Sequence, residues 1–179
     1  MQSVILFFMK YSKLPHIDLN GQYQFITFRT HDSLDEYLKK IYHTEQENSK
    51  KQLVIDAHLD LSSQGAYLFD AQISIFRQVI LEKDHFLYDL IAYSVMPNHV
   101  HILLKQKTEL VKVIKYIKGK SAVELNRSLN KSGQFWARDY YDRAIRNEAH
   151  FATVYDYILN NPLKASLPDA EERIYSVYG

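Results

Sequence analysis

SVMPNHVHILLK, residues 94–105, carries two histidines one residue apart within a stretch that otherwise has the composition of a buried strand. Pro97 and Asn98 are turn-forming residues, so the sequence predicts two strands joined here as a hairpin. Successive side chains of a strand point to opposite faces. His99 and His101 therefore share one face of the predicted sheet, which we expect to be open, while the apolar residues around them point into the core.

The spacing of the two histidines indicates a metal site. Two neutral imidazoles held a few ångströms apart on one face of a sheet can bind a divalent metal. A histidine on a strand can also be purely structural, so the pair by itself leaves both roles open.

Three groups of enzymes use a His-apolar-His pair of this kind. Histidine-triad nucleotide hydrolases continue the alternation to a third histidine, but Leu103 occupies that position here. Amidohydrolases place their pair in a barrel of about 250 residues, which is more than this chain offers. HUH nucleases carry the pair on the central strand of a ferredoxin-like sheet and add a tyrosine nucleophile from a separate helix.

The segments on either side of the hairpin predict a single α+β domain. Aromatic and β-branched residues indicate strands, and apolar residues at helical spacing indicate helices. Strands are predicted at 21–30, 86–96 and 99–105, and helices at 32–51, 70–85, 108–130 and 148–161, the last ended by Pro162; residues 51–69 are ambiguous and 133–147 irregular. This order is compatible with a ferredoxin-like sandwich, an antiparallel sheet with helices packed on one face, spanning residues 1–179 with an insertion at about 33–69.

The composition is that of a globular protein. Hydrophobic residues make up 46% of the 179 residues and charged residues 24%, and the absence of cysteine excludes disulfides and thiolate metal sites. The apolar run Val4–Met9 is too short to span a bilayer and lacks the flanks of a signal peptide. We therefore predict a cytoplasmic protein without a membrane partner.

Positive charge is concentrated in one part of the chain. Between Lys105 and Arg146, eleven Lys and Arg stand against four Asp and Glu, although the net charge of the whole chain is only +1. This asymmetry is typical of a face that binds a polyanion, and a solvated helix face gives the same pattern. The candidate DNA-contacting residues are Lys112, Lys115, Lys118, Arg143, Arg146 and Trp136.

Each of these candidates has a structural alternative. The three lysines can simply keep their helix in contact with water. The two arginines, one turn apart if this segment is locally helical, can pair with Asp139 or Asp142, and a lone tryptophan such as Trp136 can belong to the core.

A tyrosine and an amide lie one turn apart on the C-terminal predicted helix. Tyr157 can attack phosphorus while the amide oxygen of Asn161 completes a metal shell. The pKa of a free tyrosine is about 10, so a metal or a base has to assist removal of its proton. Tyr140 and Tyr141 are competing nucleophiles, and Asp142 is a candidate base or outer-shell partner of a histidine.

Four segments together resemble the REP-associated tyrosine transposases, members of the single-tyrosine HUH transposases of bacterial insertion sequences. They are LPHIDLNGQYQFITFRT, YSVMPNHVHILLK, IKGKSAVELNRSLNKSGQFWARDYYDRAIRN and YILNNPLKA, and they occur in the order of the family from about Leu14 to Ala165. The tryptophan- and serine-rich tail that usually follows in the family is replaced here by ERIYSVYG.

The resemblance implies a fold, a reaction and a set of site residues. His99 and His101 would bind Mg²⁺ or Mn²⁺, Tyr157 would be the nucleophile, and Asn161 would be the third ligand, where related transposases often have Gln. The reaction would cleave and rejoin single-stranded DNA near REP-like hairpins through a 5′-phosphotyrosine intermediate, by a monomer or a homodimer.

Two other functions stay open. One is a domesticated relative that binds DNA hairpins without cleaving them. The other is a metal-dependent phosphodiesterase that uses water in place of Tyr157.

Overall fold

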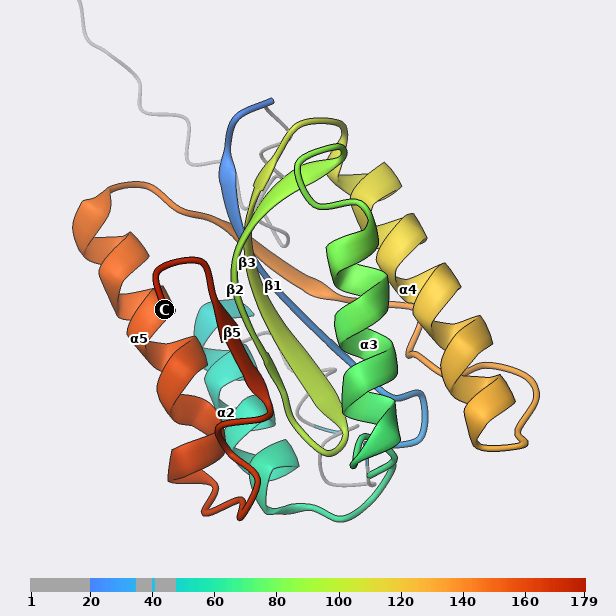
Figure 1. The fold of residues 1–179 in the computed structure, drawn as a ribbon. Coiled ribbons are helices and arrows are strands. Elements are labelled where there is room, and N and C mark those ends of the chain that lie inside the picture. Colours follow the sequence, from blue (N-terminus) through green and yellow to red (C-terminus); the bar gives the residue numbers. More distant parts are fainter. Residues whose placement is uncertain (1–19, 35–39, 41–47) are drawn as a thin grey trace, which may run out of the picture.

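The computed structural model describes residues 20–34, 40 and 48–179 (Figure 1). Two predicted segments lie wholly or mostly outside these residues, namely the apolar run Val4–Met9 and the helix over 32–51. The later part of the predicted insertion is described and contains helix α2 (Asn48–Leu61), which resolves much of the ambiguous segment 51–69.

A five-stranded antiparallel sheet, in the order β4-β1-β3-β2-β5, forms the centre of the described part of the chain (Figure 1). The predicted hairpin is its middle. The strands are β1 (Tyr23–Arg29), β2 (Tyr88–Val95), β3 (His99–Gln106), β4 (Tyr141–Ala144) and β5 (Ile174–Ser176). The predicted α+β class with an antiparallel sheet is therefore confirmed.

Helices α3 (Ala71–Glu82) and α4 (Leu110–Ser128) cover one face of the sheet (Figure 1). The alternating apolar residues of β3 that flank the histidines, Val100, Ile102 and Leu104, are fully buried in this core. Burial of this continuous apolar layer supplies most of the hydrophobic stabilisation of the fold.

The other face of the sheet is covered too, so the prediction that the histidine face is open is wrong. Helix α5 (Glu148–Lys164) packs its residues Val154 and Ile158 into a second apolar cluster with Phe25 and Leu103 of the sheet. Figure 1 shows α5 and α2 on the side of the sheet opposite α3 and α4. Sequence periodicity indicated that the histidines share a face but not that two helices pack on it.

Two further predictions of secondary structure are corrected, and one strand was missed. Helix α5 continues through Pro162 to Lys164, because the proline lies in its last turn, where Ala165 N–H reaches the Asn161 carbonyl at 3.0 Å. Part of the segment 133–147, predicted as irregular, forms the edge strand β4. The short strand β5 was not predicted, because its three residues carry no clear alternation.

One buried arginine ties the C-terminal segment to the sheet. The side chain of Arg173 is 1% exposed, and its guanidinium donates to the carbonyls of Leu68 (3.0 Å) and Val95 (2.9 Å) and to Asp169 Oδ1 (2.6 Å). Of the described helices, none has the length and apolar character needed to cross a membrane.

We expect Arg173→Met to lower the free energy of unfolding by about 3 kcal/mol, because two buried carbonyls and a carboxylate lose their donor. Chemical denaturation measures this loss. Arg127→Met is the control, since Arg127 is exposed and pairs with Glu124 on the surface of α4, and it should change stability by less than about 0.5 kcal/mol. A loss below about 1 kcal/mol for Arg173→Met would contradict the prediction.

Candidate active site

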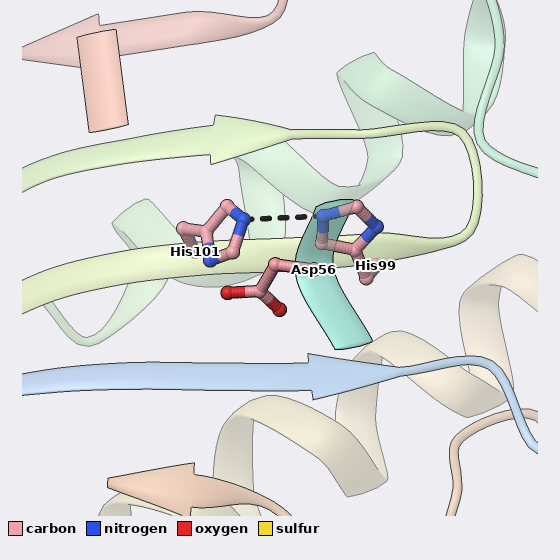
Figure 2. Close-up of side chains that lie close together, drawn as sticks. All are labelled: Asp56, His99 and His101. Carbon is pink, nitrogen blue, oxygen red and sulfur yellow. Dashed lines mark hydrogen bonds between the residues drawn. The ribbon is translucent and has the colours of Figure 1, made fainter. Parts of the chain in front are cut away.

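The two histidines of β3 face each other beneath α2 and α5. Both side chains are fully buried, and their Nε2 atoms lie 3.1 Å apart (Figure 2). The rings are nearly perpendicular, at 82°, with centroids separated by 4.8 Å. The alternation of the strand thus brings the pair together as predicted, but inside the protein rather than at its surface.

Polar neighbours fix the orientation of each ring. The side-chain nitrogen of Asn98 donates to the carbonyls of Leu59 and Ser62, each at 3.1 Å, and so its Oδ1 must point to His99 Nδ1, 2.8 Å away. His99 therefore carries its proton on Nδ1 and a lone pair on Nε2. On the second ring, His101 Nδ1 lies 2.8 Å from Thr27 Oγ1.

The histidine pair fits a divalent ion. Two neighbouring ligands of an octahedral ion with ~2.1 Å bonds lie about 3 Å apart, which matches the 3.1 Å between the two Nε2 atoms. Burial lowers the pKa of His99 to about 3 and that of His101 well below its usual value, so both rings stay neutral, as metal ligands must. Hydrogen bonds from the opposite ring nitrogens are typical of metal-binding histidines.

Two carboxylates of α2 join the histidines. One oxygen of Asp56 and one ring nitrogen of each histidine lie within 4.8 Å of one another (Figure 2), and Asp60 Oδ1 is 3.4 Å from His99 Nε2. Burial raises the pKa of Asp56 to about 7 and that of Asp60 to about 6. Neither residue was predicted from the sequence, although two acids one helical turn apart among apolar residues of one segment are a signal that could have found them.

Tyr157 reaches the same cluster from α5. Its hydroxyl donates to Asp56 Oδ2 at 3.1 Å, and its ring meets the ring of His101 at a centroid distance of 5.1 Å. Burial, followed by the charges of Asp56 and Asp60, raises the pKa of the phenol above its usual value. The hydroxyl is thus held protonated beside the histidines while the described site is closed.

Asn161 lies one turn after Tyr157 and is 2% exposed. Its side-chain nitrogen has no hydrogen-bond partner among the described residues, and neither histidine is hydrogen bonded to it. Its role as a metal ligand stays a prediction.

The two competing tyrosines, Tyr140 and Tyr141, lie on opposite faces of the sheet. Tyr140 packs with the α3/α4 core, on the wrong side of the sheet for the histidines, so it is excluded as a nucleophile by the structure. Tyr141 lies on the histidine side, opposite Thr27 in the register of β1 and β4. It packs against Phe25 at 6.1 Å but makes no described hydrogen bond to Asp56, which favours Tyr157.

Two predicted DNA contacts are structural residues. Trp136 is 4% exposed, belongs to the α3/α4 core and donates to Ser121 Oγ at 2.9 Å, so the prediction that it stacks on bases is wrong. The ammonium of Lys118 donates to the carbonyls of residues 137–139, at 2.7–3.1 Å, and so holds that loop in place. The prediction that it contacts DNA is also wrong for the described conformation.

The remaining predicted DNA contacts lie in two places. Lys112 and Lys115 are exposed on α4, on the opposite side of the sheet from the histidines, and Lys112 pairs with Glu109 at 2.8 Å. Arg143 lies in β4 opposite Phe25, which puts it on the histidine side, and Arg146 is exposed just before α5. The two arginines are not one helical turn apart, because their segment is a strand and a loop.

Sequence comparison identifies the family of the chain. A profile of the family described as "Transposase IS200 like" matches residues 68–161, more than half of the chain. The chain therefore belongs to the IS200-like transposases, a family of DNA-processing proteins.

The chain is also similar to a curated protein and to a solved structure. A Haemophilus influenzae protein named "Putative REP-associated tyrosine transposase" is 28% identical over 112 residues, which is 55% of this chain and 63%, less than two thirds, of the relative. A solved structure described as a REP-associated tyrosine transposase bound to a REP hairpin shares the fold, with a TM-score of 0.53 at 17% identity over 86% of this chain and 74% of the other.

We expect His99 to be the Nδ1–H tautomer, because Asn98 offers it only an oxygen. Long-range ¹H–¹⁵N correlation spectra of the metal-free protein distinguish the two tautomers. Asn98→Ala should abolish this preference and lower the free energy of unfolding by about 2–3 kcal/mol, since the carbonyls of Leu59, Ser62 and Gln64 lose a donor. Protonation of Nε2 in the wild type would contradict the hydrogen-bond assignment.

Proposed function

We propose that the protein is a metal-dependent endonuclease and strand transferase that acts on single-stranded DNA beside hairpins, through a covalent bond to Tyr157. The observation that carries this proposal is the position of the Tyr157 hydroxyl beside the buried histidine pair. Membership of the transposase family and the relative described with a REP hairpin support the substrate class.

In the proposed reaction the Tyr157 oxygen attacks the scissile phosphorus. A bond forms between that oxygen and phosphorus, the bond from phosphorus to the 3′ oxygen breaks, and the phenol proton leaves for a nearby acceptor while the 3′ oxygen takes up a proton. The products are a 5′-phosphotyrosine and a free 3′-OH. Attack by another 3′-OH reverses the step and joins DNA ends, and the ester keeps the bond energy, so no nucleotide cofactor is required.

His99 and His101 would hold the ion, Mg²⁺ or Mn²⁺. When bound, the ion would neutralise the phosphate and stabilise the departing 3′ oxygen. The protein's part is to fix the rings. Asn98 and Thr27 orient the two imidazoles, and the Phe25 ring stacks on His101 (5.8 Å, 21°) while meeting Tyr157 edge-on (6.0 Å, 89°).

The DNA strand would lie along the side of the sheet that carries the histidines. Arg143 is on this side, and its Nε is buried without a hydrogen-bond partner among the described residues, so a phosphate oxygen is a suitable acceptor. Arg146 would extend the contact along the strand. Lys112 and Lys115 would not contact this DNA strand, because α4 packs on the opposite face.

The described conformation is closed to DNA. Both imidazoles have no exposed surface, so a phosphodiester can reach them only after α2 or α5 is displaced. The oligomeric state, monomer or homodimer, and the cytoplasmic location remain predictions.

Tyr157→Phe should reduce formation of a covalent protein–DNA adduct by at least about 1,000-fold, because the nucleophilic oxygen is lost. The measurement uses labelled hairpin-bearing single-stranded DNA with Mn²⁺ and denaturing electrophoresis. Tyr141→Phe, which removes a hydroxyl from the same side of the sheet, is the matched control and should retain the adduct.

The same assay separates the alternatives. Cleavage by the wild type without an adduct would identify water as the nucleophile, hence a phosphodiesterase. Binding of the hairpin without cleavage would indicate a non-catalytic relative. An adduct that persists in Tyr157→Phe and vanishes in Tyr141→Phe would identify Tyr141 of β4 as the nucleophile.

Arg143→Ala should weaken binding of single-stranded DNA by about tenfold and reduce the slope of log K against log salt by about 0.7, the contribution of one phosphate contact. Fluorescence anisotropy at several salt concentrations measures both quantities. Arg127→Ala removes an exposed arginine of α4 and should change neither. If the two substitutions had equal effects, DNA would not bind preferentially on the side of the sheet that carries Arg143, and the prediction would be contradicted.

A further inference from the structure

The carboxylate of Asp56 lies in an unusual position for an acidic side chain. Its residue is 2% exposed and comes from the helix α2, far from the histidine strand in the sequence. In the part of the chain that the structure describes, its hydrogen-bond donors are the Gln52 amide, at 2.6 Å from Oδ1, and the Tyr157 hydroxyl, at 3.1 Å from Oδ2. Both donors are neutral.

The two carboxyl groups of the cluster, Asp56 and Asp60, have no matching positive side chain among the described residues. Among the described residues no Lys or Arg forms an ion pair with Asp56 or Asp60, and the nitrogen that lies beside Asp60 is Nε2 of His99, which carries a lone pair because the ring proton is on Nδ1 beside Asn98. Ionisation of a buried carboxyl is unfavourable when no cation lies nearby. A divalent cation at this place would favour the ionised form of Asp56.

The geometry allows the carboxylate and the imidazoles to bind one ion. One oxygen of Asp56 lies within 4.8 Å of a ring nitrogen of each histidine. Each carboxylate oxygen has two lone pairs, and a single hydrogen bond to each oxygen leaves the second lone pair for a metal. The Nε2 lone pair of His99 is free of a proton, as its Asn98 contact requires.

We propose that Asp56 is the third protein ligand of the ion in the DNA-free protein, and that its hydrogen bond to Tyr157 positions the nucleophile beside that ion. This inference rests on the proposed function for the role of Tyr157, but the metal site stands by itself. Helix α2, part of the predicted insertion, would thereby complete the site that β3 begins.

Asp56 is better placed for this role than Asn161. Magnesium and manganese prefer charged carboxylate oxygens, and an amide brings no charge to offset that of the ion. One oxygen of Asp56 also lies within 4.8 Å of a ring nitrogen of each histidine, whereas Asn161 is hydrogen bonded to neither histidine. Asp60, with 19% of its side chain exposed, lies at the edge of the cluster.

The test is a titration of the protein with Mn²⁺ in the absence of DNA. Calorimetry measures the heat of binding, and electron paramagnetic resonance measures the concentration of free ion. Asp56→Asn keeps the size of the side chain and an oxygen for Tyr157 but removes the charge. We expect Asp56→Asn to weaken Mn²⁺ binding by about 100-fold, and we expect the same of His99→Ala. Asp56→Asn should also reduce the rise in melting temperature that Mn²⁺ gives the wild type.

Two controls define the site. Asn161→Ala should change the affinity by less than about threefold. Asp89→Asn removes a carboxylate from the second His/Asp group, Asp84, His85 and Asp89, in which Lys107 already pairs with Asp89 at 2.8 Å. It should leave the affinity unchanged.

The outcomes separate this inference from the proposed function. If Asp56→Asn binds Mn²⁺ like the wild type while His99→Ala does not, Asp56 is not a ligand and the inference fails, whatever the DNA assay gives. If Asn161→Ala loses affinity instead, the amide is the third ligand. If Asp56→Asn loses affinity but the wild type forms no DNA adduct, the metal site stands and the proposed function fails.

Discussion

The register of β3 against β1 is the constraint on which the site depends. His101 pairs with Thr27 and His99 with Arg29 across these strands, and this alignment places the Thr27 hydroxyl at the His101 ring. A slip of one residue would turn both imidazoles into the α3/α4 core and bring apolar residues to the site. The hairpin at Pro97 and Asn98 fixes the register of β3 against β2, and Asn98 also orients the first histidine.

The two faces of the sheet have different tasks. One face packs apolar side chains against α3 and α4 and stabilises the fold. The other buries polar groups beneath α2 and α5. The ring nitrogens and both Asp56 oxygens there have hydrogen-bond partners, whereas Asp60 Oδ1 and Asn161 Nδ2 have none among the described residues. Burial lowers the pKa values of the histidines and raises those of Asp56, Asp60 and Tyr157, since in each case it disfavours the charged form.

The elements whose signal is local could be predicted from the sequence. The hairpin, helices α3 and α4, and the shared face of the two histidines follow from turn residues and periodicity. Residues whose role depends on distant neighbours were assigned less well. Trp136 and Lys118 are residue types that are common in DNA-binding surfaces. Here Trp136 fills the core and Lys118 holds a loop, because their partners lie elsewhere in the chain.

The sequence by itself determined that two imidazoles share one face of a strand, since side chains alternate whatever surrounds them, and the motif resemblance pointed to the transposase family. Only the tertiary structure decided what covers that face. Asp56 and Tyr157 are 101 positions apart in sequence, and no local pattern specifies their hydrogen bond. Packing of α2 and α5 on the same side of the sheet creates it, because helices must bury their apolar stripes against the nearest available surface.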